Sequence, residues 1–139
     1  MSKNPVVHFE MPYKDSKRVA EFYNKAFGWG MNDAGPDMGR YVVAVTADTD
    51  ENRMVKTPGT INGGFYDVNL SQASPVPSVV ISVDDLKDAV KNIEAAGGKL
   101  LGEPTEIPGI GLWVSFEDSE GNRVSILQAN NRDYTEKVK

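Results

Sequence analysis

The chain has 139 residues and a formal net charge of −5, with 20 acidic against 15 basic side chains. This length is typical of one domain, and a composition of 40% hydrophobic and 25% charged residues excludes the disordered and fibrous classes. The acidic balance disfavours nucleic acid as a partner, because binding to phosphates requires an excess of basic side chains. The chain has no cysteine, which excludes disulfides, thiolate nucleophiles and cysteine-ligated zinc.

No segment has the length or composition of a membrane span. The longest uninterrupted apolar run, from Tyr41 to Val45, has about five residues, whereas a membrane helix needs about 20. Residues 1–4 lead into no apolar stretch of the kind found in a secretory signal. We therefore expect a cytoplasmic protein with no membrane partner.

The first predicted element is a strand. Apolar and polar side chains alternate over residues 6–11, which predicts a strand with His8 and Glu10 on the same face. We expect Pro12 to end this strand, because proline has no N–H to donate to a sheet.

A helix is expected next, beginning at Asp15–Ser16 and ending at Gly28. After it we expect strands at residues 40–47 and about 61–68, with a polar loop at residues 48–59 between them. The predicted buried stripe of the helix consists of Val19, Phe22, Tyr23, Ala26 and Phe27.

The second half of the chain predicts the same order of elements. Residues 78–83 are rich in β-branched side chains and predict a strand, Asp84–Asp85 opens a helix, and Gly97–Gly98 ends it. Three further strands are predicted at residues 99–101, 112–117 and 123–128.

A shift of 70 positions aligns the two halves and superposes apolar on apolar side chains. The aligned pairs include His8 with Ser78, Val19 with Ala89, Ala20 with Val90, Tyr23 with Ile93, Ala26 with Ala96 and Gly28 with Gly98. Similarity at a fixed offset indicates a duplicated structural unit. We predict an α+β fold of two βαβββ modules, at about residues 5–70 and 76–129, packed as a single domain of residues 1–139 with a frayed tail at 130–139. The alternative is an unduplicated α+β sheet with its helices on one face.

Several short motifs resemble one protein family. They are Val6-Val7-His8-Phe9-Glu10-Met11-Pro12, Ala20-Glu21-Phe22-Tyr23 and Phe27-Gly28-Trp29 in the first half, and Val83-Asp84-Asp85-Leu86, Ala95-Ala96-Gly97-Gly98-Lys99, Pro108-Gly109-Ile110-Gly111 and Asp118-Ser119-Glu120-Gly121-Asn122 in the second. In this order and spacing, over residues 5–129, the chain resembles the vicinal oxygen chelate superfamily of glyoxalases, bleomycin-resistance proteins and extradiol dioxygenases. The resemblance implies two modules that curl their sheets around a cleft with the helices outside, and it implies a homodimer.

The resemblance also implies where a metal ion would be held. Metal-dependent members take four ligands from the first and last strands of each module, and the matching positions here are His8, Gly63, Ser78 and Ser125. Only His8 is a usual ligand, because glycine has no side chain and neutral serine hydroxyls are weak donors. We therefore expect no cofactor and no four-ligand metal site. A two-ligand site of His8 and Glu10, completed by water or substrate, is the alternative.

His8 and Glu10 are the candidate catalytic residues. The rise of a strand places them about 6.6 Å apart on one face, and an imidazole that titrates near neutral pH suits acid–base catalysis. Three interpretations are open at this point. His8 makes a structural hydrogen bond while Glu10 pairs with a lysine or arginine, the two residues bind a metal, or they transfer protons to or hydrogen-bond a substrate.

Strand parity and the resemblance predict the remaining lining of the cleft. The candidate ligand-binding residues are Phe65, Ser78, Val80, Ser82, Trp113, Arg123 and Ser125. Small and mildly polar side chains dominate this set, which is typical of a mostly apolar pocket with a few orienting hydrogen bonds. Phe65 and Trp113 are the candidate flat walls for an aromatic ligand, and burial in the helix-side core is the alternative for Trp113.

We expect a protein of the bleomycin-resistance type that binds a small organic molecule and has no four-ligand metal site. The alternative is an enzyme of the same superfamily, a lyase, isomerase or dioxygenase-like protein that uses His8 and Glu10, with or without a non-standard divalent metal. A standard metal-dependent glyoxalase is not expected. The expected partners are a small-molecule ligand and a second copy of the chain.

Overall fold

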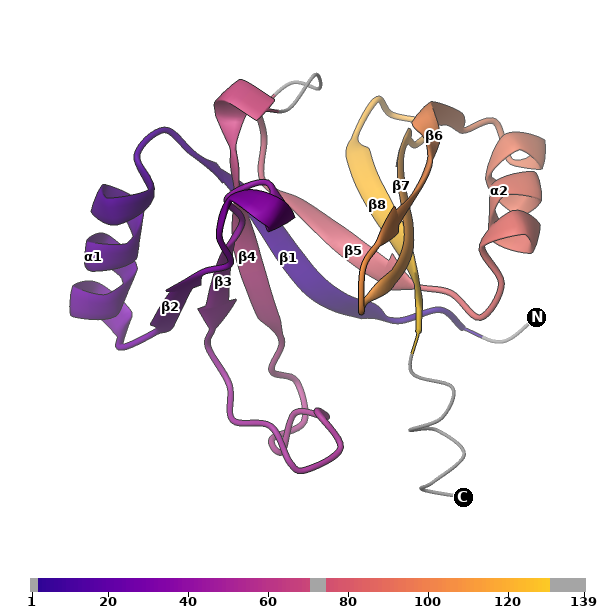
Figure 1. The fold of residues 1–139 in the computed structure, drawn as a ribbon. Coiled ribbons are helices and arrows are strands. Elements are labelled where there is room, and N and C mark those ends of the chain that lie inside the picture. Colours follow the sequence, from indigo (N-terminus) through magenta and orange to yellow (C-terminus); the bar gives the residue numbers. More distant parts are fainter. Residues whose placement is uncertain (1–2, 71–74, 131–139) are drawn as a thin grey trace. The chain divides into compact units, whose positions relative to one another are not determined.

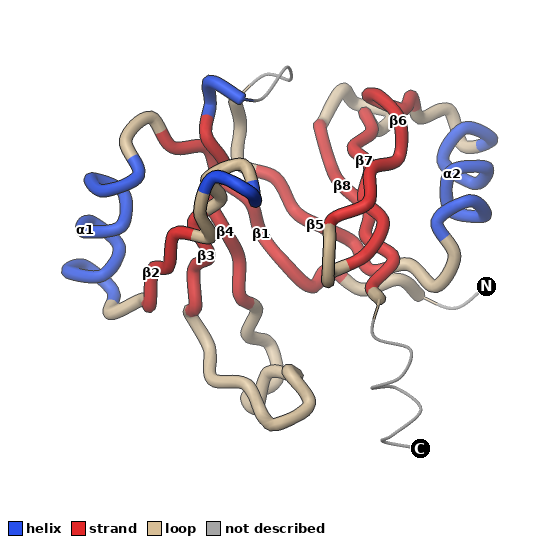
Figure 2. The backbone as a smooth tube through the Cα atoms, in the orientation of Figure 1, coloured by secondary structure: helices blue, strands red, loops and turns tan. Residues whose placement is uncertain are grey.

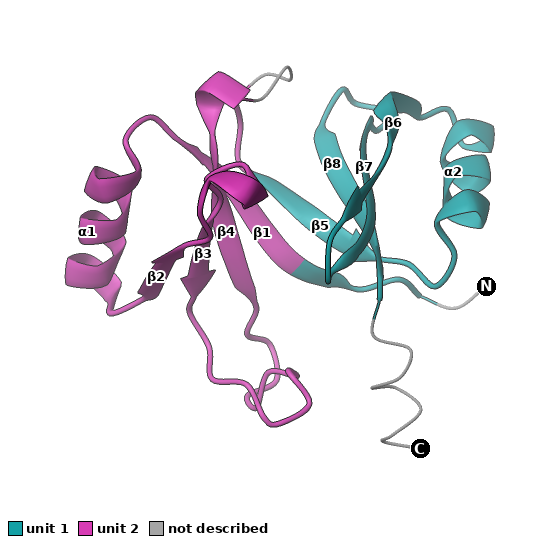
Figure 3. Ribbon diagram, viewed as in Figure 1, with its two compact units in different colours: residues 1–7, 78–139 teal, residues 8–77 magenta. Residues whose placement is uncertain are grey.

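A computed structural model describes residues 3–70 and 75–130 (Figure 1). Contacts within the chain divide it into two compact units, one of residues 8–77 and one of residues 1–7 together with 78–139 (Figure 3). Residues 71–74 of the predicted linker, and all but Asn130 of the predicted tail, lie outside the described residues.

The unit of residues 8–77 contains a mixed sheet and one long helix (Figure 2). The strand order is β2-β3-β4-β1, in which β1 is parallel to β4 and the other pairs are antiparallel. The elements are β1 (Val6–Tyr13), α1 (Ser16–Phe27), β2 (Gly30–Asp33), the 3-10 helix η1 (Pro36–Met38), β3 (Val42–Val45), β4 (Asn62–Asp67) and the 3-10 helix η2 (Val68–Leu70). Strand β1 begins in the other unit, to which residues 6 and 7 belong.

The other unit repeats this arrangement. Its strand order is β6-β7-β8-β5, in which β5 is parallel to β8 and the other pairs are antiparallel. The elements are β5 (Ser78–Ser82), α2 (Leu86–Ala95), β6 (Lys99–Ile107), β7 (Gly111–Glu117) and β8 (Arg123–Ala129). Because first and last strands pair in parallel in both units, the structure confirms the predicted α+β fold of two βαβββ modules.

The two long helices begin with equivalent caps. The Asp15 carboxylate accepts a hydrogen bond from the N–H of Arg18 at 2.9 Å, and the Asp85 carboxylate accepts one from the N–H of Asp88 at 3.0 Å. Each cap satisfies a backbone donor that the first turn of a helix leaves unpaired. Asp15 and Asp85 stand 70 positions apart, which is the offset that the sequence predicted.

Each long helix covers one face of its own sheet. Helix α1 packs through Val19 and Tyr23 against buried side chains of β1, β3 and β4, which are Tyr13, Val42, Ala44 and Phe65. Helix α2 packs through Leu86, Ala89, Val90 and Ile93 against a core that includes Val114, Phe116 and Ile126. Burial of these apolar surfaces is the main favourable term for each unit. It leaves the opposite face of each sheet for other chemistry.

Two predicted strand ends are wrong. Strand β1 continues through Pro12, which pairs in register with Tyr66 of β4. A strand directs only alternate N–H groups towards each neighbour, so one missing donor does not end the pairing. Strand β6 runs to Ile107 rather than ending at residue 101, because it pairs with β7 on both sides of a bulge between Leu101 and Thr105.

The predicted buried stripe of α1 is too wide. Phe22 is 58% exposed and Phe27 is 64% exposed, whereas Val19 and Tyr23 are partly buried against the core. Successive residues of a helix are rotated by about 100° from one another. Phe22 therefore cannot share the narrow face of Tyr23 that touches the sheet.

Two adjacent glycines of β4 allow aromatic rings to pack against both faces of the first sheet. A Cβ atom on Gly63 would collide with the ring of Phe9, which is packed against the core on the helix side. A Cβ atom on Gly64 would collide with the ring of Tyr41 on the opposite side. The β4 backbone is therefore in close contact with a ring on each face.

The substitution Gly63→Ala is expected to lower the free energy of unfolding by about 1–3 kcal/mol, because the added methyl group overpacks a filled site. Urea denaturation measures this change. Gly30→Ala is the matched control, since a Cβ atom there would meet the Cβ of Val45 at an ordinary 3.5 Å. Equal stability of the two variants would contradict the packing described for β4.

Candidate functional site

A tyrosine hydroxyl connects the two candidate catalytic residues. The Tyr41 hydroxyl donates a hydrogen bond to Glu10 Oε2 at 3.0 Å and lies 3.0 Å from His8 Nε2. The His8 and Tyr41 rings are stacked, with their centroids 6.4 Å apart and an interplanar angle of 21°. All three side chains are partly buried. The structure thus confirms that His8 and Glu10 share one face of β1, and it adds Tyr41 between them.

The backbone before β3 sets the position of Tyr41. Arg40 adopts a left-handed conformation with φ 56°, which is uncommon for a residue other than glycine. The buried Tyr13 hydroxyl donates to the carbonyl of Arg40 at 2.8 Å and holds this bend. The absence of a side chain on Gly64 then leaves room for the Tyr41 ring over β4. Three separate segments therefore place the hydroxyl between His8 and Glu10.

Burial shifts the proton equilibria of this cluster. Desolvation lowers the pKa of His8 from its ordinary value of 6.5. Desolvation raises the pKa of Tyr41, and the negative charge of Glu10 and its hydrogen bond to the hydroxyl raise it further. At neutral pH the cluster therefore contains a neutral imidazole and a neutral phenol beside the Glu10 carboxylate.

The sequence did not indicate Tyr41 as a site residue. Residue 41 stands at the start of an apolar run, where a tyrosine is an ordinary strand residue. The signal that could have found it is the Gly63–Gly64 pair, since small residues in a strand often mark a close approach of another group. The sequence does not say which ring approaches.

The side chains at the four family ligand positions do not fit a transition-metal centre. Gly63 contacts the Phe9 ring on the helix side of its sheet, which is the face opposite His8. Its neighbour Gly64 lies on the same face as His8, and it has no side chain either. Ser125 is fully buried, and its hydroxyl is hydrogen-bonded to the Ser115 hydroxyl at 2.9 Å. Of the four positions only His8 carries a usual ligand, and its Nε2 already contacts Tyr41.

The second unit gathers small polar side chains on the sheet face opposite α2. Val80 pairs in register with Ser125 in the parallel β5 and β8 strands, and Ser115 pairs with Ser125 in β7 and β8. Ser82 and Arg123 share this face by strand parity, as does Ser78, whose buried hydroxyl has no hydrogen-bond partner within residues 3–70 and 75–130. Six of the predicted ligand-binding residues, Ser78, Val80, Ser82, Trp113, Arg123 and Ser125, therefore lie on one face of one sheet.

The two predicted aromatic walls have different positions. Trp113 alternates with Leu112 and Val114, which pack towards α2, so it lies on the opposite face with Ser115. Phe65 is only 1% exposed and belongs to the core between α1 and its sheet, where its ring lies 5.1 Å from that of Tyr23. Its predicted role as a wall for a ligand is therefore wrong. A core position in β4 has the same apolar sequence signature as a cleft position, and only the strand register separates them.

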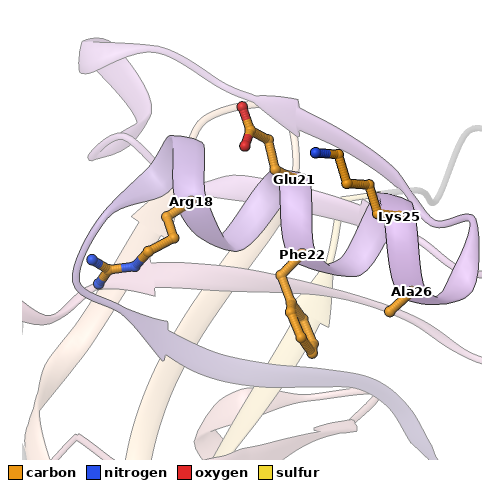
Figure 4. Close-up of a pocket in the computed structure, with 5 residues that line it drawn as sticks. All are labelled: Arg18, Glu21, Phe22, Lys25 and Ala26. Atoms are coloured by element: carbon orange, nitrogen blue, oxygen red, sulfur yellow. The ribbon is translucent and has the colours of Figure 1, made fainter.

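A surface depression lies on the outward side of α1, and none of the candidate catalytic or ligand-binding residues lines it. It is lined by Arg18, Glu21, Phe22, Lys25 and Ala26, which follow one side of the helix (Figure 4). Trp29, at the end of the same helix, stacks on Tyr23 with ring centroids 4.7 Å apart and packs with the core.

The chain belongs to the Glyoxalase/Bleomycin resistance protein/Dioxygenase superfamily, whose family model matches residues 6–126. It is 30% identical over 123 residues to a glyoxylase-like domain-containing protein of Didymella fabae, covering 84% of this chain and 88% of that protein. It is 25% identical over 130 residues to a probable lactoylglutathione lyase of Vibrio cholerae, covering 92% of this chain and 93% of the relative.

Solved structures share the fold at low sequence identity. A methylmalonyl-CoA epimerase of Streptomyces coelicolor in complex with 2-nitronate-propionyl-CoA superposes with a TM-score of 0.68 and 14% identity, covering 93% of this chain and 96% of that chain. The epimerase of Mycobacterium tuberculosis gives a TM-score of 0.58 and 16% identity, with 88% and 85% covered. At such identities the likeness shows the fold alone. Among the described residues no helix is long and apolar enough to cross a membrane.

The imidazole of His8 is expected to titrate below its ordinary pKa of 6.5, because burial disfavours the charged ring. The unfolded chain then binds more protons on His8 than the folded chain does as the pH falls through 6.5. His8 therefore contributes stability that is present above this pH and is lost on acidification towards the folded pKa. NMR follows the titration without ambiguity, since the chain has one histidine.

Urea denaturation across the same pH range tests the link to stability. The His8→Gln variant should lose less stability than the parent protein between pH 7 and pH 5. A midpoint for His8 at or above 6.5 would contradict the burial that the structure assigns to this ring.

Proposed function

We propose that this chain binds a small organic molecule, with His8, Tyr41 and Glu10 as the polar part of the binding surface. The observation that carries the proposal is the partly buried hydrogen-bond cluster of these residues on the sheet face opposite α1. A few fixed polar groups on a mostly apolar surface are the usual composition of small-molecule sites, because they orient the ligand. A cluster with only a structural role would not need to remain partly exposed, whereas these three side chains are only partly buried.

The relatives support a small-molecule ligand rather than a macromolecular one. Two proteins of similar fold or sequence are named for acting on lactoylglutathione and methylmalonyl-CoA. The net charge of −5 favours neutral or cationic molecules over polyanions. We propose binding without the four-ligand metal, because the matching positions offer one imidazole, one glycine and two serines. The absence of a cofactor and the homodimer stay predictions.

An acid–base enzyme is the second candidate, and the neutral state of His8 favours it. A partly buried imidazole is neutral when the pH lies above its pKa, and in this form it can accept a proton. A carboxylate linked to it through one hydroxyl can stabilise the product. Reactions that remove a proton from a bound organic molecule fit this arrangement. Glu10 is then connected to the imidazole through the Tyr41 hydroxyl.

Thermal denaturation with a defined panel tests binding. The panel contains S-lactoylglutathione, methylmalonyl-CoA, bleomycin and a library of neutral and cationic fragments. A ligand at about 100 times its Kd adds about 2.7 kcal/mol to the stability, which raises the Tm by several degrees. The rise should shrink or vanish in His8→Ala and persist in Tyr23→Phe, a change in the α1 core. A ligand that stabilises parent and His8→Ala equally would refute the assigned surface.

Hydrogen–deuterium exchange separates the enzyme from the binding protein. A bound ligand with an acidic C–H should exchange it for deuterium in heavy water, and NMR of the ligand follows the signal. We expect the rate to fall about 100-fold or more in His8→Ala, the usual size of a general-base effect. Tight binding with no exchange and no other turnover would support the binding function and reject the acid–base enzyme.

A further inference from the structure

Two hydrogen bonds meet at the Tyr41 hydroxyl, one with His8 and one with Glu10, and the hydroxyl has a single hydrogen to donate. An ionised carboxylate accepts hydrogen bonds and donates none, so the single hydroxyl hydrogen of Tyr41 goes to Glu10 Oε2. The hydroxyl oxygen then has only lone pairs left for its 3.0 Å contact with His8 Nε2. That contact is a hydrogen bond only if Nε2 carries the ring hydrogen.

We propose that Tyr41 holds His8 in the tautomer with its hydrogen on Nε2, so that His8 presents Nδ1 to a ligand as a hydrogen-bond acceptor. The residue is a positioning residue, since it acts on the ligand through the imidazole. The ligand class that follows is a molecule that donates an N–H or O–H to this atom. The inference rests on the proposed function for the location of the site, but the tautomer itself is a property of the unliganded protein.

Nδ1 is available for this contact. His8 has no hydrogen bond in the described part of the chain other than the one to Tyr41. In residues 3–70 and 75–130, the fully buried polar atoms without a partner include the Ser78 hydroxyl oxygen but not His8 Nδ1. It is therefore not sealed inside the unit. The imidazole is fixed at one nitrogen and open at the other, which is the arrangement of an oriented acceptor.

The two hydrogen bonds among these side chains can reverse their direction when His8 Nδ1 accepts a proton from a ligand. The ligand X–H bond breaks and a new N–H bond forms at Nδ1, while the Nε2 hydrogen moves to the Tyr41 oxygen. The original hydroxyl hydrogen of Tyr41 moves to Glu10 Oε2. The ligand leaves as X⁻, His8 and Tyr41 stay neutral, and the carboxylate of Glu10 becomes a carboxylic acid, so charge and protons balance.

This relay gives the buried imidazole a route that avoids a positive charge. Desolvation lowers the pKa of His8 and raises that of Tyr41, so neither an imidazolium nor a tyrosinate is favoured here. A concerted shift changes only the tautomer of His8 and places the proton on the carboxyl group. Tyr41 is needed for it, because its hydroxyl connects His8 Nε2 to Glu10 Oε2.

The tautomer is measured directly by NMR of the protein labelled with ¹⁵N in histidine, after treatment with chelator. The single histidine leaves no ambiguity of assignment. We expect the Nε2–H form to dominate by about tenfold or more above the pKa of His8, a ratio that corresponds to about 1.4 kcal/mol and to one net hydrogen bond. A dominant Nδ1–H form, or an even mixture, would overturn the proposal.

Two variants test the role of Tyr41. Tyr41→Phe should lower the ratio of the Nε2–H to the Nδ1–H form to that of a free histidine side chain, whereas the control Tyr23→Phe should leave the ratio unchanged. Tyr23 lies in the same unit, and its hydroxyl has no hydrogen bond in the described residues. Glu10→Gln should move the population towards Nδ1–H, because Tyr41 no longer faces a charged acceptor. It also serves as the test if Tyr41→Phe does not fold. An unchanged ratio in a folded variant of either residue would refute the assignment.

Matched fragments test the ligand class separately. Each pair differs in one donor, such as a primary amide against its N,N-dimethyl amide or an alcohol against its methyl ether. Only the donor member should shift the Nδ1 resonance, and equal shifts from both members would overturn the acceptor role. If no compound binds but the Nε2–H form dominates and depends on Tyr41, the proposed function fails while the tautomer assignment is supported.

Discussion

The close approach of two aromatic rings to the backbone of β4 is the constraint on which the first unit depends. Gly63 admits the Phe9 ring to the core beneath α1, and Gly64 admits the Tyr41 ring on the other face. A side chain at either position would separate a ring from the sheet. One dipeptide thus couples the packing of the hydrophobic core to the placement of a polar cluster, because both rings rest on opposite sides of the same strand.

The polar cluster combines rigidity with an incomplete set of hydrogen bonds. Tyr13 and the bend at Arg40 hold Tyr41, and Tyr41 in turn connects His8 to Glu10. Buried polar groups are costly unless they are paired, so a cluster of this kind is stable only when each member has a partner. The remaining nitrogen of His8 is the exception. An acceptor held on a strand, with no hydrogen-bond partner in residues 3–70 and 75–130, is suited to a ligand.

The two modules share a fold and differ in chemistry. The first sheet places an imidazole, a phenol and a carboxylate on the face opposite its helix, whereas the second places serines, Arg123 and Trp113 on the corresponding face. Duplication preserved the helix caps at Asp15 and Asp85 and the parallel pairing of first and last strands. Membership of the superfamily therefore accounts for the architecture, while the activity depends on side chains that the fold leaves free to vary.

The amino-acid sequence by itself determined the two-module fold, the helix ends and the shared face of His8 and Glu10. These features depend on local patterns, such as alternation along a strand and a cap before a helix, that act over a few residues. Tertiary structure alone decided that Phe65 is core and that Tyr41 lies between His8 and Glu10. The reason is that these outcomes depend on strand register and on contacts across more than 30 positions of sequence, and no local pattern encodes which distant side chain fills the space above a glycine.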